Sequence, residues 1–158
     1  MAEPETHSRI IDEAEAYWCR LRGGRAMPAR HDVDPADIRR LLPFVMIIGV
    51  TRVGGVPRFR YRLLGTGIVA RSARDYTGMD IEELPFQRSP SRIASLYLDA
   101  TRGAGPVRRV IPRAGQEDPR FGPIGMVAPL SDDGRTVDGL FGVFDFSPIE
   151  VPQPVPVL

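Results

Sequence analysis

Two segments of this chain are apolar on both faces, and they limit the folds that it can adopt. Residues 44–50 (FVMIIGV) and 137–146 (VDGLFGVFDF) place apolar side chains on either side of an extended backbone. A strand of this kind needs covering on both faces, whereas a strand that alternates apolar and charged residues needs covering on only one. We therefore predict that these two segments lie side by side at the centre of a sheet.

Two of the three other strand candidates carry residues typical of a sheet edge. In residues 58–63 three arginines alternate with apolar side chains, and residues 107–113 (VRRVIPR) contain Pro112, which a central strand would exclude. The third candidate, residues 121–130 (FGPIGMVAPL), is joined to the last strand by the Asp-Asp-Gly turn at 132–134. An antiparallel sheet with the strand order 2-1-5-4-3 satisfies all five patterns.

Helical patterns precede and interrupt these strands. Residues 5–22 form an amphipathic pattern that ends at a Gly-Gly pair, and residues 66–105 contain two short helical patterns and a longer one at 90–102. We expect an α+β domain in which the helices, including this helical insert, pack on one face of the sheet.

The N-terminal helix carries an apolar stripe with a tryptophan and a tyrosine, so it must cover an apolar surface. That surface belongs either to the same domain or to a second copy of the chain. Our candidates for an interface are Ile10, Ile11, Tyr17, Trp18 and Leu21.

The composition indicates a folded domain in a reducing compartment. The 158 residues are 42% hydrophobic and 26% charged with a net charge of +1, which fits a globular chain and not a disordered one. A single cysteine excludes an intramolecular disulfide, and no apolar run approaches the length of a membrane span. We expect a cytoplasmic protein with an N-terminal helix and linker (1–30), a domain (31–148) and a proline-rich extended tail (149–158).

One glycine motif matches a dinucleotide fingerprint in its letters but not in its context. Gly65-Thr66-Gly67 with Ala70 has the form G-x-G-x-x-A. That site requires a buried parallel strand before the glycines and a second parallel strand after the helix. Here the preceding strand carries arginines and no strand follows within the expected distance. We interpret both glycines as residues that let the chain leave an edge strand and turn into a short helix.

The edge strands would also carry a row of arginines, which raises the question of nucleic-acid binding. Recognition by a sheet needs aromatic side chains on the same surface, but alternation places Phe59 and Tyr61 on the opposite face. Because the net charge is also near zero, we predict no nucleic-acid partner and a solvated face that discourages edge-to-edge pairing. The arginines are Arg58, Arg60, Arg62, Arg108, Arg109 and Arg113.

The order of the elements and two stretches of sequence resemble a PAS domain. The stretches are YWCRLRGGRAMPARHDVDPADIRRLLP (17–43) and RFRYRLLGTGIVARSARDYTGMDIEEL (58–84). They are most similar to a bacterial, alphaproteobacterial PAS-like family formerly known only as a domain of unknown function. The resemblance implies a sensory or regulatory module, usually without catalysis. It implies no particular ligand, since PAS domains bind haem, flavins, metabolites or nothing known.

We expect neither haem nor a photoactive flavin as a cofactor. Haem needs an axial ligand, commonly histidine, in the pocket between the insert and the sheet, but His7 and His31 both precede the first strand. The photoactive flavin form of the fold needs a cysteine in the insert. Cys19 lies in the N-terminal helix instead, and we interpret it as a buried, inert thiol.

We also predict no metal site and no catalytic residues. Without a histidine in the body of the domain, acid–base chemistry would fall to carboxylates that the capping of turns already explains. These are Asp75, Asp80, Glu82 and Glu83.

The remaining hypothesis is a ligand pocket between the insert and the sheet. A buried tyrosine hydroxyl needs a partner, so Tyr61 and Tyr97 are candidates to orient the polar end of a ligand, whereas most of the other residues are explained as core. The inward-facing candidates are Tyr61, Leu63, Ile68, Met79, Ile93, Tyr97, Met126 and Val143.

These patterns favour a stand-alone PAS-like sensory domain. It would bind a small molecule or a signalling protein partner and act through association, for example as a homodimer. Two alternatives stay open: a small-molecule or nucleotide-using enzyme on a similar α+β scaffold, and a ligand-free adaptor with a filled core.

Overall fold

The computed structural model describes residues 8–72, 74–103, 105–112 and 122–147. Its helices and strands are α1 (Arg9–Arg22), β1 (Val45–Val53), β2 (Val56–Leu64), α2 (Thr66–Arg71), α3 (Arg92–Ala100), β3 (Val107–Val110), β4 (Ile124–Leu130) and β5 (Gly139–Asp145). Short 3₁₀ helices are η1 (Arg30–Asp32), η2 (Pro35–Ile38), η3 (Leu42–Phe44) and η4 (Ile81–Glu83).

The five strands form one antiparallel sheet in the order β2-β1-β5-β4-β3, which confirms the prediction from the sequence patterns. β1 pairs with β5 from Val45 opposite Val143 to Gly49 opposite Gly139, so the two segments that are apolar on both faces are neighbours. Every residue of β4 and β5 is buried, whereas β2 and β3 at the rims include exposed residues.

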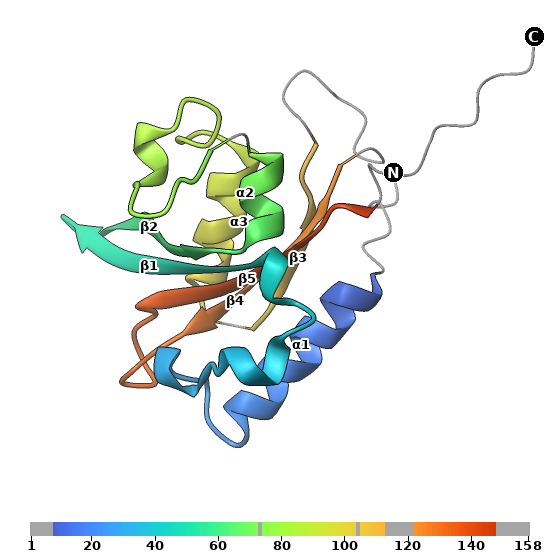
Figure 1. Ribbon diagram of the computed structural model, residues 1–158. Coiled ribbons are helices and arrows are strands. Elements are labelled where there is room, and N and C mark those ends of the chain that lie inside the picture. The colour runs from blue at the N-terminus through green and yellow to red at the C-terminus, as the bar shows by residue number, and fades with distance from the viewer. Residues whose placement is uncertain (1–7, 73, 104, 113–121, 148–158) are drawn as a thin grey trace, which may run out of the picture.

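Helices cover both faces of this sheet (Figure 1). The insert lies on one face, as we predict, but our expectation that all the helices share that face is wrong. α1 packs on β4 and β5, where Trp18 Nε1 donates to the Pro129 carbonyl at 2.9 Å and the rings of Tyr17 and Phe141 are 6.0 Å apart. α2 and α3 lie on the other side (Figure 1). The reason lies in the strands: because β4 and β5 are apolar on both faces, one layer of helices would leave their second face in water.

α1 is capped at both ends, and its start is tied to the sheet. The hydroxyl of Ser8 accepts a hydrogen bond from the backbone N–H of Ile11 and donates to Asp145 Oδ2 at 2.5 Å. The helix ends at Gly23, whose φ of +57° is accessible to glycine at little cost. The helix is therefore anchored to the end of β5 at its first turn.

Cys19 is exposed on α1, which corrects its interpretation as a buried thiol. The preceding residue, Trp18, is fully buried against the sheet. Consecutive helical residues are rotated by about 100°, so the thiol lies outside the buried stripe.

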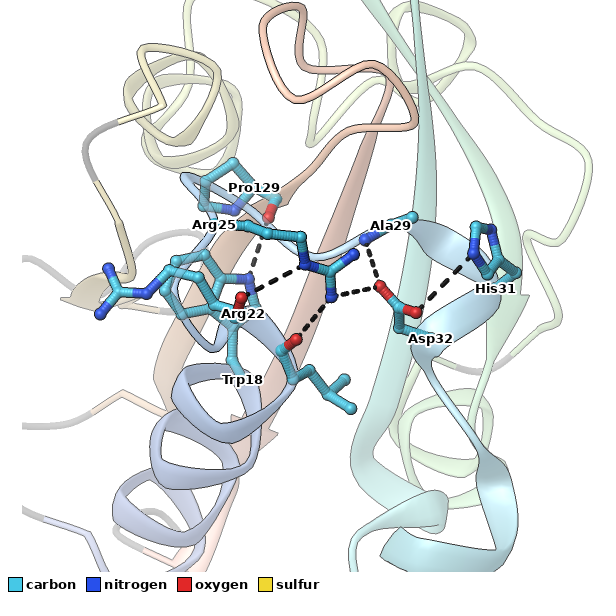
Figure 2. A network of polar contacts seen from close by, with 8 residues as sticks. Trp18, Arg22, Arg25, Ala29, His31, Asp32 and Pro129 are labelled. Carbon is cyan, nitrogen blue, oxygen red and sulfur yellow. Dashed lines mark hydrogen bonds and ion pairs between the residues drawn. The ribbon is translucent and has the colours of Figure 1, made fainter.

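An ion pair between Arg25 and Asp32 holds the linker after α1 in place (Figure 2). The guanidinium of Arg25 lies 2.8 Å from the carboxylate of Asp32, and the same carboxylate accepts a bond from the backbone N–H of Ala29 at 2.8 Å. The bond from Ala29, followed by that from Arg25, holds the pKa of Asp32 below its ordinary value. Next to this turn the Pro28 carbonyl accepts a bond from the N–H of Ser131, so the linker returns to the sheet.

Candidate functional site

A cavity of about 310 Å³ lies between the sheet and the helical insert. This volume is at the lower end of the range of small-molecule sites, roughly 300–1,000 Å³. The described residues that line the cavity are Met46, Tyr61, Leu64, Ile68, Arg71, Ser72, Tyr76, Phe86, Gln87, Ile93, Ile111, Pro112, Pro123, Phe144 and Phe146.

A β-bulge in β2 decides which residues of that strand face the cavity. Tyr61 lies opposite Ile48 and Leu63 lies opposite Ile47, so Arg62 has no partner across the ladder between β1 and β2. The extra residue reverses the alternation, and Leu64 lines the cavity in place of Leu63, which simple alternation predicts.

Three polar side chains form a chain of hydrogen bonds at one wall of the cavity. Tyr61 Oη lies 2.5 Å from Oε1 of Gln87 and 2.7 Å from Oη of Tyr97. Because an amide oxygen can only accept, Tyr61 donates its single proton to Gln87 and accepts one from Tyr97. The chain of donors therefore runs from Tyr97 through Tyr61 to Gln87.

Both tyrosines are buried and stay protonated. Tyr97 is 0% exposed and Tyr61 is 3% exposed, and this burial raises the pKa of both hydroxyls above the ordinary value of tyrosine. The ring of Tyr97 meets the rings of Phe59 and Tyr61 edge-on, at 5.6 and 6.3 Å between centres. The two hydroxyls are thus fixed, neutral hydrogen-bonding groups.

Arg71 of α2 supplies the one formal charge among the described residues that line the cavity. The carbon at the centre of its guanidinium lies 4.8 Å from the centre of the Phe146 ring and 5.8 Å from that of Phe44, and Nη1 donates to the Gly67 carbonyl at 3.1 Å. Stacking on aromatic faces is a favourable position for an arginine. The cavity therefore has a cationic group on one wall.

The structure brings together about half of the predicted pocket residues. Tyr61, Ile68 and Ile93 line the cavity, and Tyr97 lies directly behind Tyr61. Met79 is partly buried against the core, where its carbonyl accepts a bond from the N–H of Tyr61, but it does not line the cavity.

Met126 and Val143 lie on the opposite face of the sheet, which corrects their assignment to the pocket. They are paired across β4 and β5 and so share a face. Val143 lies on the same face of β5 as Phe141 and Asp145, which are two residues away on either side. Phe141 contacts α1, and Asp145 bonds to the N-cap of α1. Both faces of these strands are apolar, so apolar character alone does not tell which face meets the insert.

Sequence reasoning missed Gln87 and Arg71, and it did not use Phe144 and Phe146 as pocket residues. The alternation of β5 places the two phenylalanines on the face opposite to Val143, so this signal was present in the sequence. Gln87 lies in a stretch without helical or strand period, and no pattern marks it.

The apolar stripe of α1 faces the sheet of the same chain. Ile11, Tyr17 and Trp18 are at most 3% exposed, and Ile10 and Leu21 are partly buried against the same core. The sequence left open whether this stripe covers the same domain or a second copy of the chain, and the structure shows that it covers the same domain. An interface through these side chains would require α1 to leave the sheet, and that hypothesis stays a prediction.

The glycines of the fingerprint allow close contact between α2 and η3. A Cβ on Gly65 would lie 2.3 Å from the Leu42 carbonyl oxygen and 2.4 Å from that of Pro43, and one on Gly67 would lie 2.8 Å from the ring of Phe44. Gly65 has an ordinary φ of −62°. The glycines are thus required by packing, and α2 leads to η4 and α3, not to a parallel strand.

Three of the rim arginines form ion pairs with carboxylates of the same chain. Arg108 of β3 pairs with Asp12 at 2.8 Å and with Glu15, both on α1. Arg113 lies outside the described residues. Further ion pairs of the rim strands are Arg58–Asp80 and Arg109–Asp99. These strands therefore carry paired charges and not a uniformly basic surface.

Among the described residues, no three His, Cys, Asp or Glu side chains are grouped so that they could hold a metal ion. His31 lies in η1, 3.7 Å from Asp32, and does not line the cavity, while His7 lies outside the described residues. No helix in the part of the chain that the structure describes combines the length and apolar character needed to cross a membrane.

A family model for the PAS domain matches residues 6–144, from before α1 into β5. No curated protein matches the chain.

Proposed function

Because the chain belongs to the PAS domain family, which consists of sensory and regulatory domains, we propose that it binds a small molecule between the sheet and the insert and signals through association. The observation that carries this proposal is the cavity of about 310 Å³ with a polar wall. An adaptor with a filled core would bind no small molecule at this place, so a binding titration separates the two alternatives.

The groups that line the cavity support binding over turnover. Arg71, Tyr61 and Tyr76 are its ionisable side chains among the described residues, and burial keeps Tyr61 protonated. The described lining contains no histidine and no carboxylate, the side chains that most often act as general bases. A nucleotide-using enzyme would be stabilised by NAD or FAD in a thermal-shift assay, whereas the proposed binding domain would respond to small apolar compounds.

β5 offers a route from the cavity to α1. Phe144 lines the cavity, while its neighbours in the strand, Val143 and Asp145, lie on the face that α1 covers. A ligand that displaces Phe144 would shift the strand on which α1 rests, and the exposed side of α1 would then present a changed surface to a second copy or to a signalling protein.

A thermal-shift titration with propylbenzene tests the ligand site. A compound that binds only the folded state raises the free energy of unfolding by RT ln(1 + [L]/Kd). We expect the melting temperature of the wild type to rise, and we expect Ile93→Phe, which fills the cavity from α3, to abolish the rise.

Leu98→Phe is the matched control for this test. Leu98 lies on the same helix, is 41% exposed and does not line the cavity, so the larger ring should leave the response unchanged. An equal rise in Ile93→Phe and wild type, or no rise in the wild type, would contradict the proposal.

A further inference from the structure

We infer that the cavity selects an uncharged molecule with an apolar body and one hydrogen-bond acceptor, such as an arylalkyl ketone. This inference rests on the proposed function, because it names the chemical class of the ligand for the same cavity. Three features of the lining point to this class: the orientation of the Gln87 amide, the bonds that the other polar groups already make, and the apolar walls.

The length of the contact between Tyr61 and Gln87 identifies the amide atom that makes it. Tyr61 Oη lies 2.5 Å from Oε1 of Gln87. A hydrogen bond from a hydroxyl to an oxygen can be as short as about 2.5 Å, whereas one from an N–H to an oxygen is roughly 2.7–3.2 Å long. The amide oxygen is therefore bonded to Tyr61, and the amide nitrogen is the end that remains for a ligand.

Gln87 offers hydrogen-bond donors at the cavity. It is partly buried and lines the cavity, and no group of the described residues accepts a bond from the two N–H donors of its Nε2. Its backbone is held, because its N–H donates to the Leu84 carbonyl at 2.9 Å and its carbonyl accepts from Ser91 Oγ at 2.7 Å. The donor is thus positioned before a ligand arrives, which lowers the entropy cost of binding.

The other polar side chains of the lining already have partners. The hydroxyls of Ser72 and Tyr76 donate to backbone carbonyls at 2.8 and 3.3 Å. Arg71 stacks on the rings of Phe44 and Phe146 and donates to a backbone carbonyl at 3.1 Å. An uncharged ligand leaves these contacts as they are, whereas an ion would lose its hydration in a largely apolar site and would need a free counter-charge.

The remaining walls are suited to a compact apolar body. Met46 and Leu64 from the sheet face Ile68 and Ile93 from the insert, and the ring of Phe144 completes this surface. With a volume near 310 Å³, the cavity matches one ring and a short chain better than a large cofactor.

Two compounds that differ in one group test the class. 4-Phenylbutan-2-one has a carbonyl oxygen where (3-methylbut-3-enyl)benzene has a CH₂ group, so the pair keeps one shape and changes only the acceptor. Both are titrated into the full chain at pH 7, and ¹H–¹⁵N NMR gives the dissociation constants. Without a donor in the cavity the ketone would bind more weakly, because it gives up its bonds to water. We expect the ketone to bind at least as tightly as the alkene.

The side-chain NH₂ signals of Gln87 report the contact directly. The chain has three glutamines, Gln87, Gln116 and Gln153, and no asparagine, so it gives three side-chain NH₂ pairs. The pair that is missing in Gln87→Glu belongs to Gln87. We expect one proton of this pair to lie further downfield in the ketone complex than in the alkene complex.

Gln87→Glu also removes the donor while it keeps the bond to Tyr61. A glutamate can still accept from the tyrosine, but its carboxylate has no N–H. We expect the dissociation constant of the ketone, divided by that of the alkene, to rise about tenfold. Because the two ligands have one shape, a general effect of the new charge on the cavity cancels in this ratio.

Leu98→Glu is the matched control. It adds the same charge on α3, at a position that is 41% exposed and outside the lining, so the ratio should stay at its wild-type value.

An unchanged ratio in Gln87→Glu, or a ketone that binds the wild type more weakly than the alkene does, would overturn the ligand class. Binding of the alkene in the same experiment would then leave the proposed function intact. Failure of both compounds to bind would overturn both.

Discussion

At the scale of single residues, Tyr61 connects the sheet, the insert and the cavity. Its hydroxyl bonds to Gln87 and Tyr97, and its backbone N–H and carbonyl pair with Met79 and Gly78 along the outer edge of β2. Because these groups are buried, removing one partner leaves another polar group without its bond, which costs more than the bond itself contributes.

Replacing the two tyrosines separately should therefore have unequal effects. Tyr97→Phe leaves Tyr61 donating to Gln87 and should cost about 1 kcal/mol of unfolding free energy. Tyr61→Phe leaves the Tyr97 hydroxyl with only the Met46 sulfur, 3.5 Å away, and should cost about 2–3 kcal/mol. Urea denaturation of both variants and of the double variant measures this.

The double variant is the control for coupling between the hydroxyls. Its cost should be less than the sum of the single costs, because each single change breaks the same bond. Additive costs would show that the two hydroxyls do not interact in solution.

At the scale of elements, the short helix α2 depends on packing against a neighbouring element, because it is too short to be stable alone. Six residues are too few to be stable as an isolated helix, so α2 is held by its packing on η3. Gly65 makes that packing possible, because any side chain there would meet backbone atoms of Leu42 and Pro43.

Gly65→Ala should accordingly destabilise the protein by about 2–3 kcal/mol through overpacking, measured by urea denaturation. Gly24→Ala is the matched control, since a Cβ there meets nothing within 4 Å. A change at Gly65 as small as that at Gly24 would show that η3 can move away at little cost.

The turn between β4 and β5 carries a pH-dependent contribution to stability. Three hydrogen bonds, from the N–H groups of Thr136 and Arg135 and the hydroxyl of Ser131, lower the pKa of Asp133 to about 2. A carboxyl whose pKa is lower in the folded state binds protons more readily when unfolded. Its contribution is therefore complete above its unfolded pKa, near 4, and is lost as the pH falls toward 2.

Asp133→Asn should remove that contribution. The variant should be less stable than the wild type at pH 7, and the two unfolding free energies should converge between pH 4 and pH 2 in urea titrations. Asp132→Asn, which removes a carboxylate from the same turn but keeps the three hydrogen bonds to Asp133, is the matched control. A constant difference between Asp133→Asn and wild type across this range would contradict the assignment.

At the scale of the whole molecule, the sheet separates two helical layers to which we assign different roles. One face carries α1, and the other carries the insert (Figure 1). The cavity lies between the insert and the sheet. β5 belongs to both faces, because its alternate residues contact the cavity and α1. Any signal from a ligand to α1 has to cross this central layer.

Trp18 is the reporter for that signal, because it is the one tryptophan of the chain and its indole N–H bonds to the Pro129 carbonyl. We expect propylbenzene to shift the indole resonance in ¹H–¹⁵N spectra of the wild type but not of Ile93→Phe. An unmoved indole signal alongside shifted cavity resonances would mean that binding is not relayed to α1.

Most of the sheet could be predicted from the sequence, because the pattern of each strand is local. The apolar character of both faces of β1 and β5, together with the arginines of β2 and the arginines and proline near β3, was enough to order five strands. The site was harder. Leu63 was predicted in place of Leu64 because the bulge at Arg62 has no local mark, and Met126 and Val143 were assigned to the wrong face because both faces are apolar.

By itself the sequence determined which strands are central, where α1 ends and that the glycine fingerprint lacks the context of a nucleotide site. All three follow from properties of a few neighbouring residues: side-chain period, glycine conformation and chain order. Only the tertiary structure decided that α1 lies opposite the insert and that Gln87 meets Tyr61. These contacts join residues that are distant in sequence, and they depend on register and packing, which no local pattern encodes.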